Sequence, residues 1–275
     1  MKKLFFITAI LCAVFCSSCS KDESFQDSSL FVRSIEFGNL SKSGEKSELS
    51  DIIYDEKGRV KQAAADCLGP NHKFNFSYND NNTMTISCSD VSTPSYHIQL
   101  NEKGYVSKIE WQWLERTIVM DYICEITYDN NGYILSITLE QYRNGQDDGV
   151  DYYQYVWEGG NLIRINEYDS FYGEEVDRNY RYTEYENNLN IDVNNIVSIY
   201  GHPDAVFDIL GAFNFFGKRS KNLVDRYVGY ESAHHSGYGR KYSYYFNENN
   251  ILSEVRFPAY PNSPEYGIDY LKFKY

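Results

Sequence analysis

The sequence repeats one short unit, in which an alternating stretch leads through a polar turn into a second alternating stretch. The clearest copy is Tyr128-Asp129-Asn130-Asn131-Gly132-Tyr133-Ile134. Asn, Asp and Gly suit the turn because they tolerate positive φ and because Asn and Asp side chains bond to the nearby backbone. Such turns begin at intervals of 22 to 29 residues between positions 55 and 186, and another begins at position 247. This spacing predicts an antiparallel array of hairpins.

Alternation within the strands indicates which face of the sheet is buried. Ile109, Trp111 and Trp113 alternate with charged and amide side chains, and residues 121–128 alternate in the same way. A single apolar face means that one side of the sheet packs on a core while the other meets water. Such a sheet must curl round or be covered by a second layer. We therefore predict an all-β fold, a curled antiparallel meander of hairpins shaped like a barrel or half-barrel.

One segment departs from this pattern, after an alternating stretch that ends at Val193. From Pro203 to Phe216 the apolar residues follow a period near 3.6, which predicts an amphipathic helix, although Gly211 lies inside it. Pro suits the first helical position, and Gly217 suits the stop. We expect this helix over residues 203–216, extended loosely to Tyr227, within a helical insertion over about residues 196–227 that plugs or caps one end of the sheet.

The first residues predict a secretory signal over residues 1–18. Lys2 and Lys3 precede an apolar run that is too short to span a membrane. Two serines then precede Cys19, and this arrangement resembles a bacterial lipobox, which implies lipid attachment at Cys19. Cys12 and Cys16 are weaker candidates for the lipidated residue, and an ordinary cleaved signal is the alternative.

Ser20-Lys21-Asp22-Glu23 follows Cys19 directly. A lysine and two acids at this place resemble the signal that sends lipoproteins of Bacteroidetes to the outer face of the outer membrane. A solvated tether is the alternative reading of the same charges. We expect residues 19–30 to form a flexible tether and residues 31–275 to form a single β domain.

The charge and the cysteines exclude several classes of function. The net charge of −13 opposes nucleic acid and anionic membrane surfaces as partners, and after the signal no stretch is long and apolar enough for a transmembrane helix. Cys67, Cys88 and Cys124 are an odd number, so at most one disulfide forms, and its members are left open. Cys88 and Cys124 have the parity of core residues. No Cys/His cluster indicates zinc.

The unit Tyr54-Asp55-Glu56-Lys57-Gly58-Arg59-Val60 is similar to the YD repeats of RHS-type proteins, whose sheets coil into shells. Together with Cys19 and the break after residue 194, the chain resembles an uncharacterised Bacteroidetes lipoprotein family with a porin-like domain of unknown function. The resemblance covers residues 30–275, implies a curled antiparallel sheet and supplies no catalytic residues. A membrane barrel needs an outward apolar band with aromatic girdles, so we take "porin-like" to describe shape alone.

Aromatic residues are in excess, with 27 Tyr, 16 Phe and 3 Trp. Exposed Tyr and Trp on a sheet can stack on sugar rings, whereas Tyr is also a common structural residue in strands. Rings crowd both faces of one strand near residue 155 and of another near residue 244. The candidate ligand-binding aromatics are Tyr152, Tyr153, Tyr155, Trp157, Tyr242 and Tyr245.

Other candidate sites are weak. His234 and His235 on a Gly-rich loop could bind a metal together with Glu231, but adjacent histidines are more often plain loop residues. Asp147-Asp148-Gly149 with Asp151 lacks the ligand spacing of a calcium loop, and residues 144–149 serve as a long hairpin turn. We predict no metal, cofactor or catalytic residue.

The sequence thus favours a surface-exposed outer-membrane lipoprotein that acts as a non-enzymatic binding module for a glycan or a cell-surface protein. One alternative is an extracellular hydrolase of polysaccharide or peptide that uses carboxylates in the concavity of the sheet. The other is a structural component of an outer-membrane complex.

Overall fold

The computed structural model describes residues 31–40, 46–65, 72–79, 82–89, 93–170, 173–198, 205–229, 238–258 and 267–275. The chain divides into two units, Met1–Phe31 and Val32–Tyr275, and the second holds all of the described helices and strands. The predicted signal, the tether, Cys19, Cys67, His234 and His235 lie outside the described residues.

One antiparallel sheet contains the 17 described strands. They are β1 (Ser34–Asn39), β2 (Lys46–Tyr54), β3 (Val60–Ala65), β4 (Lys73–Asn79), β5 (Thr83–Cys88), β6 (Tyr96–Leu100), β7 (Val106–Glu115), β8 (Ile118–Tyr128), β9 (Ile134–Arg143), β10 (Gln146–Glu158), β11 (Asn161–Asp169), β12 (Glu174–Glu186), β13 (Asn222–Gly229), β14 (Tyr238–Lys241), β15 (Ser243–Phe246), β16 (Leu252–Pro258) and β17 (Ile268–Lys274).

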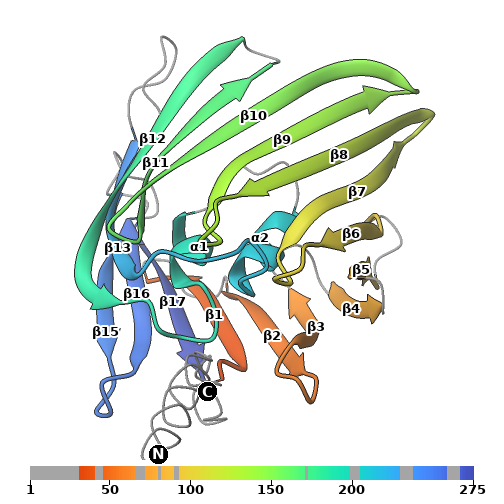
Figure 1. Cartoon of the computed structure of the whole chain (residues 1–275). Coiled ribbons are helices and arrows are strands. Elements are labelled where there is room, and N and C mark those ends of the chain that lie inside the picture. Colours follow the sequence, from red (N-terminus) through yellow and green to blue (C-terminus); the bar gives the residue numbers. More distant parts are fainter. Residues whose placement is uncertain are drawn as a thin grey trace, which may run out of the picture. The chain divides into compact units, whose positions relative to one another are not determined.

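The sheet curls into a nearly closed barrel (Figure 1). Strands neighbour one another in chain order, and the first strand also pairs with the last, with Ile35 of β1 opposite Phe273 of β17. Strands β14 and β15 belong to one stretch of chain interrupted at Tyr242, and they pair with β13 and β16 respectively. The predicted all-β meander of curled hairpins is confirmed.

Two short helices, α1 (Val193–Ser198) and α2 (Ala205–Ala212), lie within the curl of the sheet (Figure 1). The expected helix over 203–216 ends earlier, at Ala212, and the expected strand up to Val193 is instead an irregular segment that leads into α1. Buried residues spaced by two in this segment imitate a strand, because each points into the interior. The insertion also ends before residue 227, since β13 pairs with β12 from Asn222 onward.

The core lies between the inner face of the sheet and the helices. Ile109 and Cys124 face inward opposite each other on β7 and β8, and both are fully buried. Phe207 of α2 meets the ring of Trp111 edge-on, with 5.9 Å between the ring centroids. Trp113 has the same parity but is 40% exposed, so its predicted place in the core is wrong. Trp113 lies two residues further along β7 than Trp111, beyond the contact with α2.

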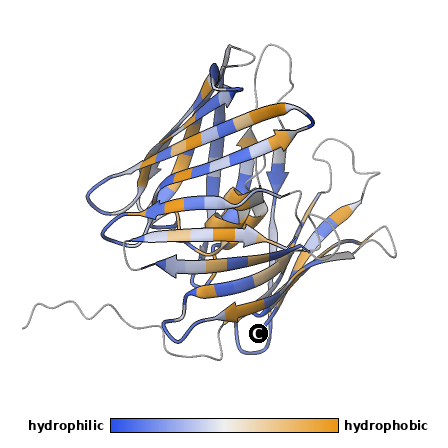
Figure 2. Ribbon diagram, turned by 90° about the vertical axis from the view of Figure 1, so that its right-hand side faces the viewer, coloured by the Kyte–Doolittle hydropathy of each residue, from blue (hydrophilic) through white to orange (hydrophobic). Residues whose placement is uncertain are grey.

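The outer face of the sheet is mainly polar. Lys108, Glu125 and Thr138 lie side by side across β7, β8 and β9, and hydrophilic and hydrophobic residues alternate along the strands (Figure 2). Exposed apolar side chains such as Leu135 and Tyr168 are interspersed among them. Within the described residues, no helix is long and apolar enough to cross a membrane.

In several of the polar turns, the first side chain fixes the conformation. The Oδ1 atom of Asp129 accepts a hydrogen bond of 2.8 Å from the backbone N–H of Tyr133, and Asn101 accepts in the same way from Tyr105 at 3.0 Å. Gly132 then adopts a φ of 93°, which a residue with a side chain rarely adopts. These needs explain why Asp or Asn opens the turn and Gly closes it.

An aromatic side chain near the end of most returning strands joins the two strands of its hairpin. The hydroxyl of Tyr128 on β8 donates to the carbonyl oxygen of Val106 on β7 at 2.6 Å. We call these bonds aromatic clasps. Leu100 precedes a turn as Tyr128 does, but its side chain has no hydrogen-bond donor and cannot form a clasp. The other clasps join Tyr54 to Val32, Tyr78 to Val60, Trp157 to Ile134, Tyr182 to Leu162, Tyr244 to Val224 and Tyr275 to Leu252.

Residues 213–221, which we call the capping segment, cross the end of the barrel where these turns lie. The carbonyl of Phe215 accepts from the N–H of Val106 at 2.8 Å, and the N–H of Lys218 donates to the carbonyl of Gly132 at 2.8 Å. The N–H of Lys221 donates to the carbonyl of Gly160 at 2.9 Å. The capping segment thus bonds to successive hairpin ends and holds the helices inside the barrel.

Candidate functional site

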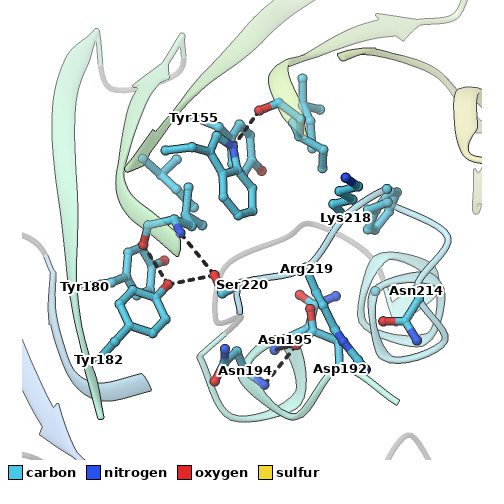
Figure 3. A pocket seen from close by; sticks show the side chains of 18 residues that line it. Tyr155, Tyr180, Tyr182, Asp192, Asn194, Asn195, Asn214, Lys218, Arg219 and Ser220 are labelled. Atoms are coloured by element: carbon cyan, nitrogen blue, oxygen red, sulfur yellow. Dashed lines mark hydrogen bonds between the residues drawn. The ribbon is translucent and has the colours of Figure 1, made fainter. Parts of the chain in front are cut away.

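A cavity of about 90 Å³ lies between the inner face of β9–β12 and the chain that follows β12 (Figure 3). Strand parity turns one wall inward, and the insertion and the capping segment supply the other. Its lining comprises Ile134, Ile137, Tyr155, Trp157, Leu162, Ile165, Tyr180, Tyr182, Asp192, Asn194, Asn195, Gly211, Asn214, Phe216, Gly217, Lys218, Arg219 and Ser220.

The wall formed by the sheet is aromatic, and clasps hold part of it in place. Trp157 donates from Nε1 to the carbonyl of Ile134 at 2.8 Å. The Tyr182 hydroxyl lies 2.6 Å from the carbonyl oxygen of Leu162 and 2.9 Å from Oγ of Ser220. Because their polar ends are engaged in this way, these residues present mainly ring surface to the cavity.

Asp192 is the carboxylate of the cavity. Its Oδ1 atom accepts hydrogen bonds from Nδ2 of Asn187 at 2.8 Å and from the backbone N–H of Asn194 at 3.1 Å, which caps α1. Within the described chain no hydrogen bond uses Oδ2. One oxygen therefore holds the local fold, while the other is available to the cavity.

Arg219 balances the charge of Asp192. Its guanidinium donates to the carbonyl oxygens of Leu189 and Ile191, the second at 2.9 Å. Burial raises the pKa of Asp192, and the positive charge of Arg219 opposes that rise. Burial also lowers the pKa of Arg219, and Asp192 opposes that change. The two charges thus support each other inside the barrel.

Other polar groups around the cavity keep unused hydrogen-bonding capacity. Among the residues that the structure describes, the hydroxyls of Tyr155 and Tyr180 have no hydrogen-bond partner, nor does Nζ of Lys218. Asn214 donates from Nδ2 to the carbonyl of Asn190 at 2.9 Å, while its Oδ1 atom is buried and without a partner in the same part of the chain. Buried polar atoms are normally satisfied, so the unpartnered Oδ1 atom of Asn214 is unusual.

Gly211 is in the helix because α1 and α2 approach closely there. A Cβ atom at this position would lie 1.5 Å from Nδ2 of Asn195, which also lines the cavity. No side chain fits at that distance. The glycine that weakened the helical pattern in the sequence thus lets Asn195 reach the cavity.

The six predicted aromatics do not form a single site. Tyr155 and Trp157 line the cavity, and Tyr153 is buried on the same face of β10. Tyr152 lies on the outer face, directly opposite Tyr168 of β11, and both are partly exposed. In the remaining strand, Tyr242 is buried with its ring 5.6 Å from that of Phe257, and Tyr245 is 42% exposed beneath the guanidinium of Arg256.

The polar part of the cavity lining was missed at the level of sequence. Asp192, Asn195 and Asn214 come from the insertion, whose pattern indicated a plug and not a site. One available signal was the density of asparagine between residues 187 and 195, where the strand pattern breaks. Amide side chains are costly to bury without partners, so their concentration in an inserted segment marks a polar interior.

The weak metal candidates gain no support in the described chain. There, no group of three or more His, Cys, Asp or Glu side chains could hold a metal ion. Asp148 forms an ion pair with Arg143 at 3.0 Å. The expected long turn over 144–149 is instead a tight turn at Asn144 and Gly145, both with positive φ. Cys88 and Cys124 are free thiols, and burial raises the pKa of Cys124.

These features define a class of protein, a plugged barrel-like sheet with a mainly polar outer face and a small cavity inside. No protein-family model and no curated protein matches the chain. The solved structures that resemble it include two described as porin-like proteins. The one from Bacteroides uniformis ATCC 8492 has a TM-score of 0.62 and 13% identity, over 88% of this chain and 97% of that one. The one from Bacteroides vulgatus ATCC 8482 has a TM-score of 0.63 and 12% identity, over 90% and 98%. The likeness confirms the porin-like fold.

Proposed function

We propose that the protein is a non-enzymatic binding module, anchored at the cell surface through a lipid on Cys19. The observation that carries the proposal is the cavity, where aromatic walls surround hydrogen-bonding groups that the described chain leaves unused. Ligand pockets combine apolar walls with a few convergent polar groups in this manner. The polar outer wall and the filled interior further support a water-exposed scaffold over a lipid-embedded channel.

Binding fits the cavity better than hydrolysis does. Glycoside hydrolysis uses two carboxylates across a cleft, and Asp192 is the single carboxylate among the lining residues. The Ser220 hydroxyl is engaged with the N–H of Leu162 at 3.1 Å and with Tyr182. The described lining contains no histidine that could activate it. The alternative of a hydrolase therefore finds no support in the cavity.

A glycan suits the cavity better than a protein partner does. Tyrosine and tryptophan rings pack on the C–H faces of sugars, and carboxylate, amide and hydroxyl groups bond to sugar hydroxyls. Export and lipidation, suggested by Cys19 and the charges after it, would bring such a module into contact with extracellular polysaccharide. Residues 19–30 would then separate the domain from the membrane.

Two measurements test the proposal. A glycan array with the chain from Ser20 onward is expected to show binding, and the bound glycan is expected to raise the melting temperature without being cleaved. Cys19→Ala in the full chain is expected to release the protein from the membrane fraction and from the reach of externally added protease. The absence of glycan binding would redirect the search to protein partners. Cleavage of a bound glycan would establish the hydrolase.

A further inference from the structure

We propose that the cavity binds an uncharged, hydroxyl-rich group, which is either a small free polyol or the end of a neutral sugar chain. This inference rests on the proposed binding function and names the chemistry of its ligand. It is argued from the polar atoms that face the cavity, from their charges and from the size of the space.

Two oxygens of the lining residues can only accept hydrogen bonds. One is Oδ2 of Asp192, which no hydrogen bond within the described chain uses. The other is Oδ1 of Asn214, which is buried and has no partner in that part of the chain. An acceptor that a ligand covers without supplying a donor costs about 1–3 kcal/mol. The ligand must therefore bring donors. Carboxylates lack donors at neutral pH and would also face Asp192, so the cavity is unsuited to them.

The ligand must also be able to accept hydrogen bonds. The hydroxyls of Tyr155 and Tyr180 each have a proton to donate, and within the described chain nothing receives it. An ammonium group offers donors alone and would meet the positive charges of Arg219 and Lys218. A hydroxyl both donates and accepts, so it satisfies the acceptors and the tyrosines together.

The size of the cavity limits what enters. Its volume of about 90 Å³ has room for several ordered waters. A three-carbon polyol, or the corresponding part of a terminal sugar, fits this space with its C–H groups against Tyr155 and Trp157. Lys218 is exposed and lines the cavity, so a longer sugar chain can continue into solvent at that end.

Matched small probes test the chemistry. Glycerol is compared with 1,2-propanediol, which lacks one hydroxyl, with glycerol phosphate, which adds an anion, and with 2-amino-1,3-propanediol, which adds an ammonium. Neutral oligosaccharides form a second arm that separates a sugar-chain end from a free polyol. Binding is measured by saturation-transfer NMR and calorimetry on the chain from Ser20 onward. Glycerol is expected to bind at least about tenfold more tightly than the other three small probes, since a site built for hydroxyls rejects analogues that lack one.

Two variants and two controls locate the binding. Tyr155→Phe removes one hydroxyl, and Asp192→Asn turns an acceptor into a donor while keeping an oxygen that can cap α1. Each is expected to weaken glycerol and oligosaccharide binding by about tenfold. Tyr142→Phe and Asp148→Asn make the same chemical changes outside the lining, where Tyr142 bonds to Glu140 and Asp148 to Arg143. These controls are expected to bind like the unmodified chain.

The outcomes separate this inference from the proposed function. Tighter binding of glycerol phosphate or of the amine than of glycerol would overturn the neutral class of ligand. Glycan binding that persists unchanged in Tyr155→Phe and Asp192→Asn would overturn the cavity as the site and leave a binding module that uses another surface. Loss of all binding, to small probes and to glycans alike, would overturn both.

Discussion

The indole N–H of Trp157 donates a hydrogen bond of 2.8 Å to the carbonyl oxygen of Ile134, and both residues line the cavity. The clasp between Tyr182 and Leu162 also joins two residues that line the cavity. The bonds that close successive hairpins therefore also shape the aromatic wall. The cavity is thus built from the repeat itself together with the insertion.

The clasps are expected to contribute to stability. Tyr128→Phe leaves the carbonyl of Val106 without the hydroxyl that now bonds to it at 2.6 Å, so the free energy of unfolding should fall by about 1–3 kcal/mol. Urea denaturation followed by circular dichroism measures the change. Tyr142→Phe is the control, because its hydroxyl bonds to Glu140 on the outer face. Equal losses in both variants would contradict a structural role for the clasp.

Gly211→Ala is expected to destabilise the protein although alanine favours helices by about 1 kcal/mol over glycine. The new methyl group would lie 1.5 Å from Nδ2 of Asn195, and overpacking of this kind costs about 1–3 kcal/mol. Adding Asn195→Ala should recover most of the loss. A double-mutant cycle measures the coupling between the two positions. Additive effects would show that the two side chains do not compete for space.

The stability of the unmodified chain relative to Asp192→Asn is expected to depend on pH. Burial raises the pKa of Asp192 in the folded state above its unfolded value of about 3.9. Below that value both states are protonated and no penalty arises. As the pH rises through the folded pKa, the native state must hold a buried charge, so its stability relative to the variant falls.

Denaturation of both proteins near pH 3.5 and at pH 7 checks this expectation. The difference between the free energies of unfolding of the two proteins cancels the contribution of the other titrating acids. From the lower to the higher pH, the free energy of unfolding of the unmodified chain should fall relative to that of Asp192→Asn. A gain would mean that the charge of Arg219 outweighs burial, and a constant difference would mean that the charge of Arg219 just offsets burial.

Cys124 is expected to resist alkylation in the folded protein. Its thiol is fully buried, and burial raises its pKa, so little thiolate forms at neutral pH. Iodoacetamide labelling followed by peptide mass spectrometry should modify Cys124 in urea and not in buffer. Rapid labelling under native conditions would reveal an opening of the sheet near β8.

The repeated turns carried most of the information about the fold. Local chemistry at Asp129 and Gly132 specifies a turn, and alternation specifies the inner face, so an antiparallel curled sheet follows. Trp113 shows the limit of parity, because a residue can face inward beyond the part of the barrel that the helices fill. The irregular segment before α1 shows another limit, since its buried spacing matched a strand.

The cavity was harder to predict because its residues meet only in three dimensions. Tyr155 was a candidate by composition, but nothing near it in the sequence indicates Asp192 or Asn214. They become neighbours because the sheet curls and the capping segment crosses its end. Hydrogen bonds such as that from the N–H of Lys218 to Gly132, 86 residues apart in the sequence, fix this arrangement.

The pairing of β1 with β17 has a consequence for the order of folding. Each hairpin can form as soon as its two strands are available, because its contacts are local. The hydroxyl of Tyr270 meets Oε1 of Glu36 across 234 residues of sequence, so the circuit of strands cannot close until the final strand arrives. Such distant contacts form slowly. A chain emerging from a ribosome or a translocation channel would therefore remain an open series of hairpins. The barrel would close only after strand β17 had emerged.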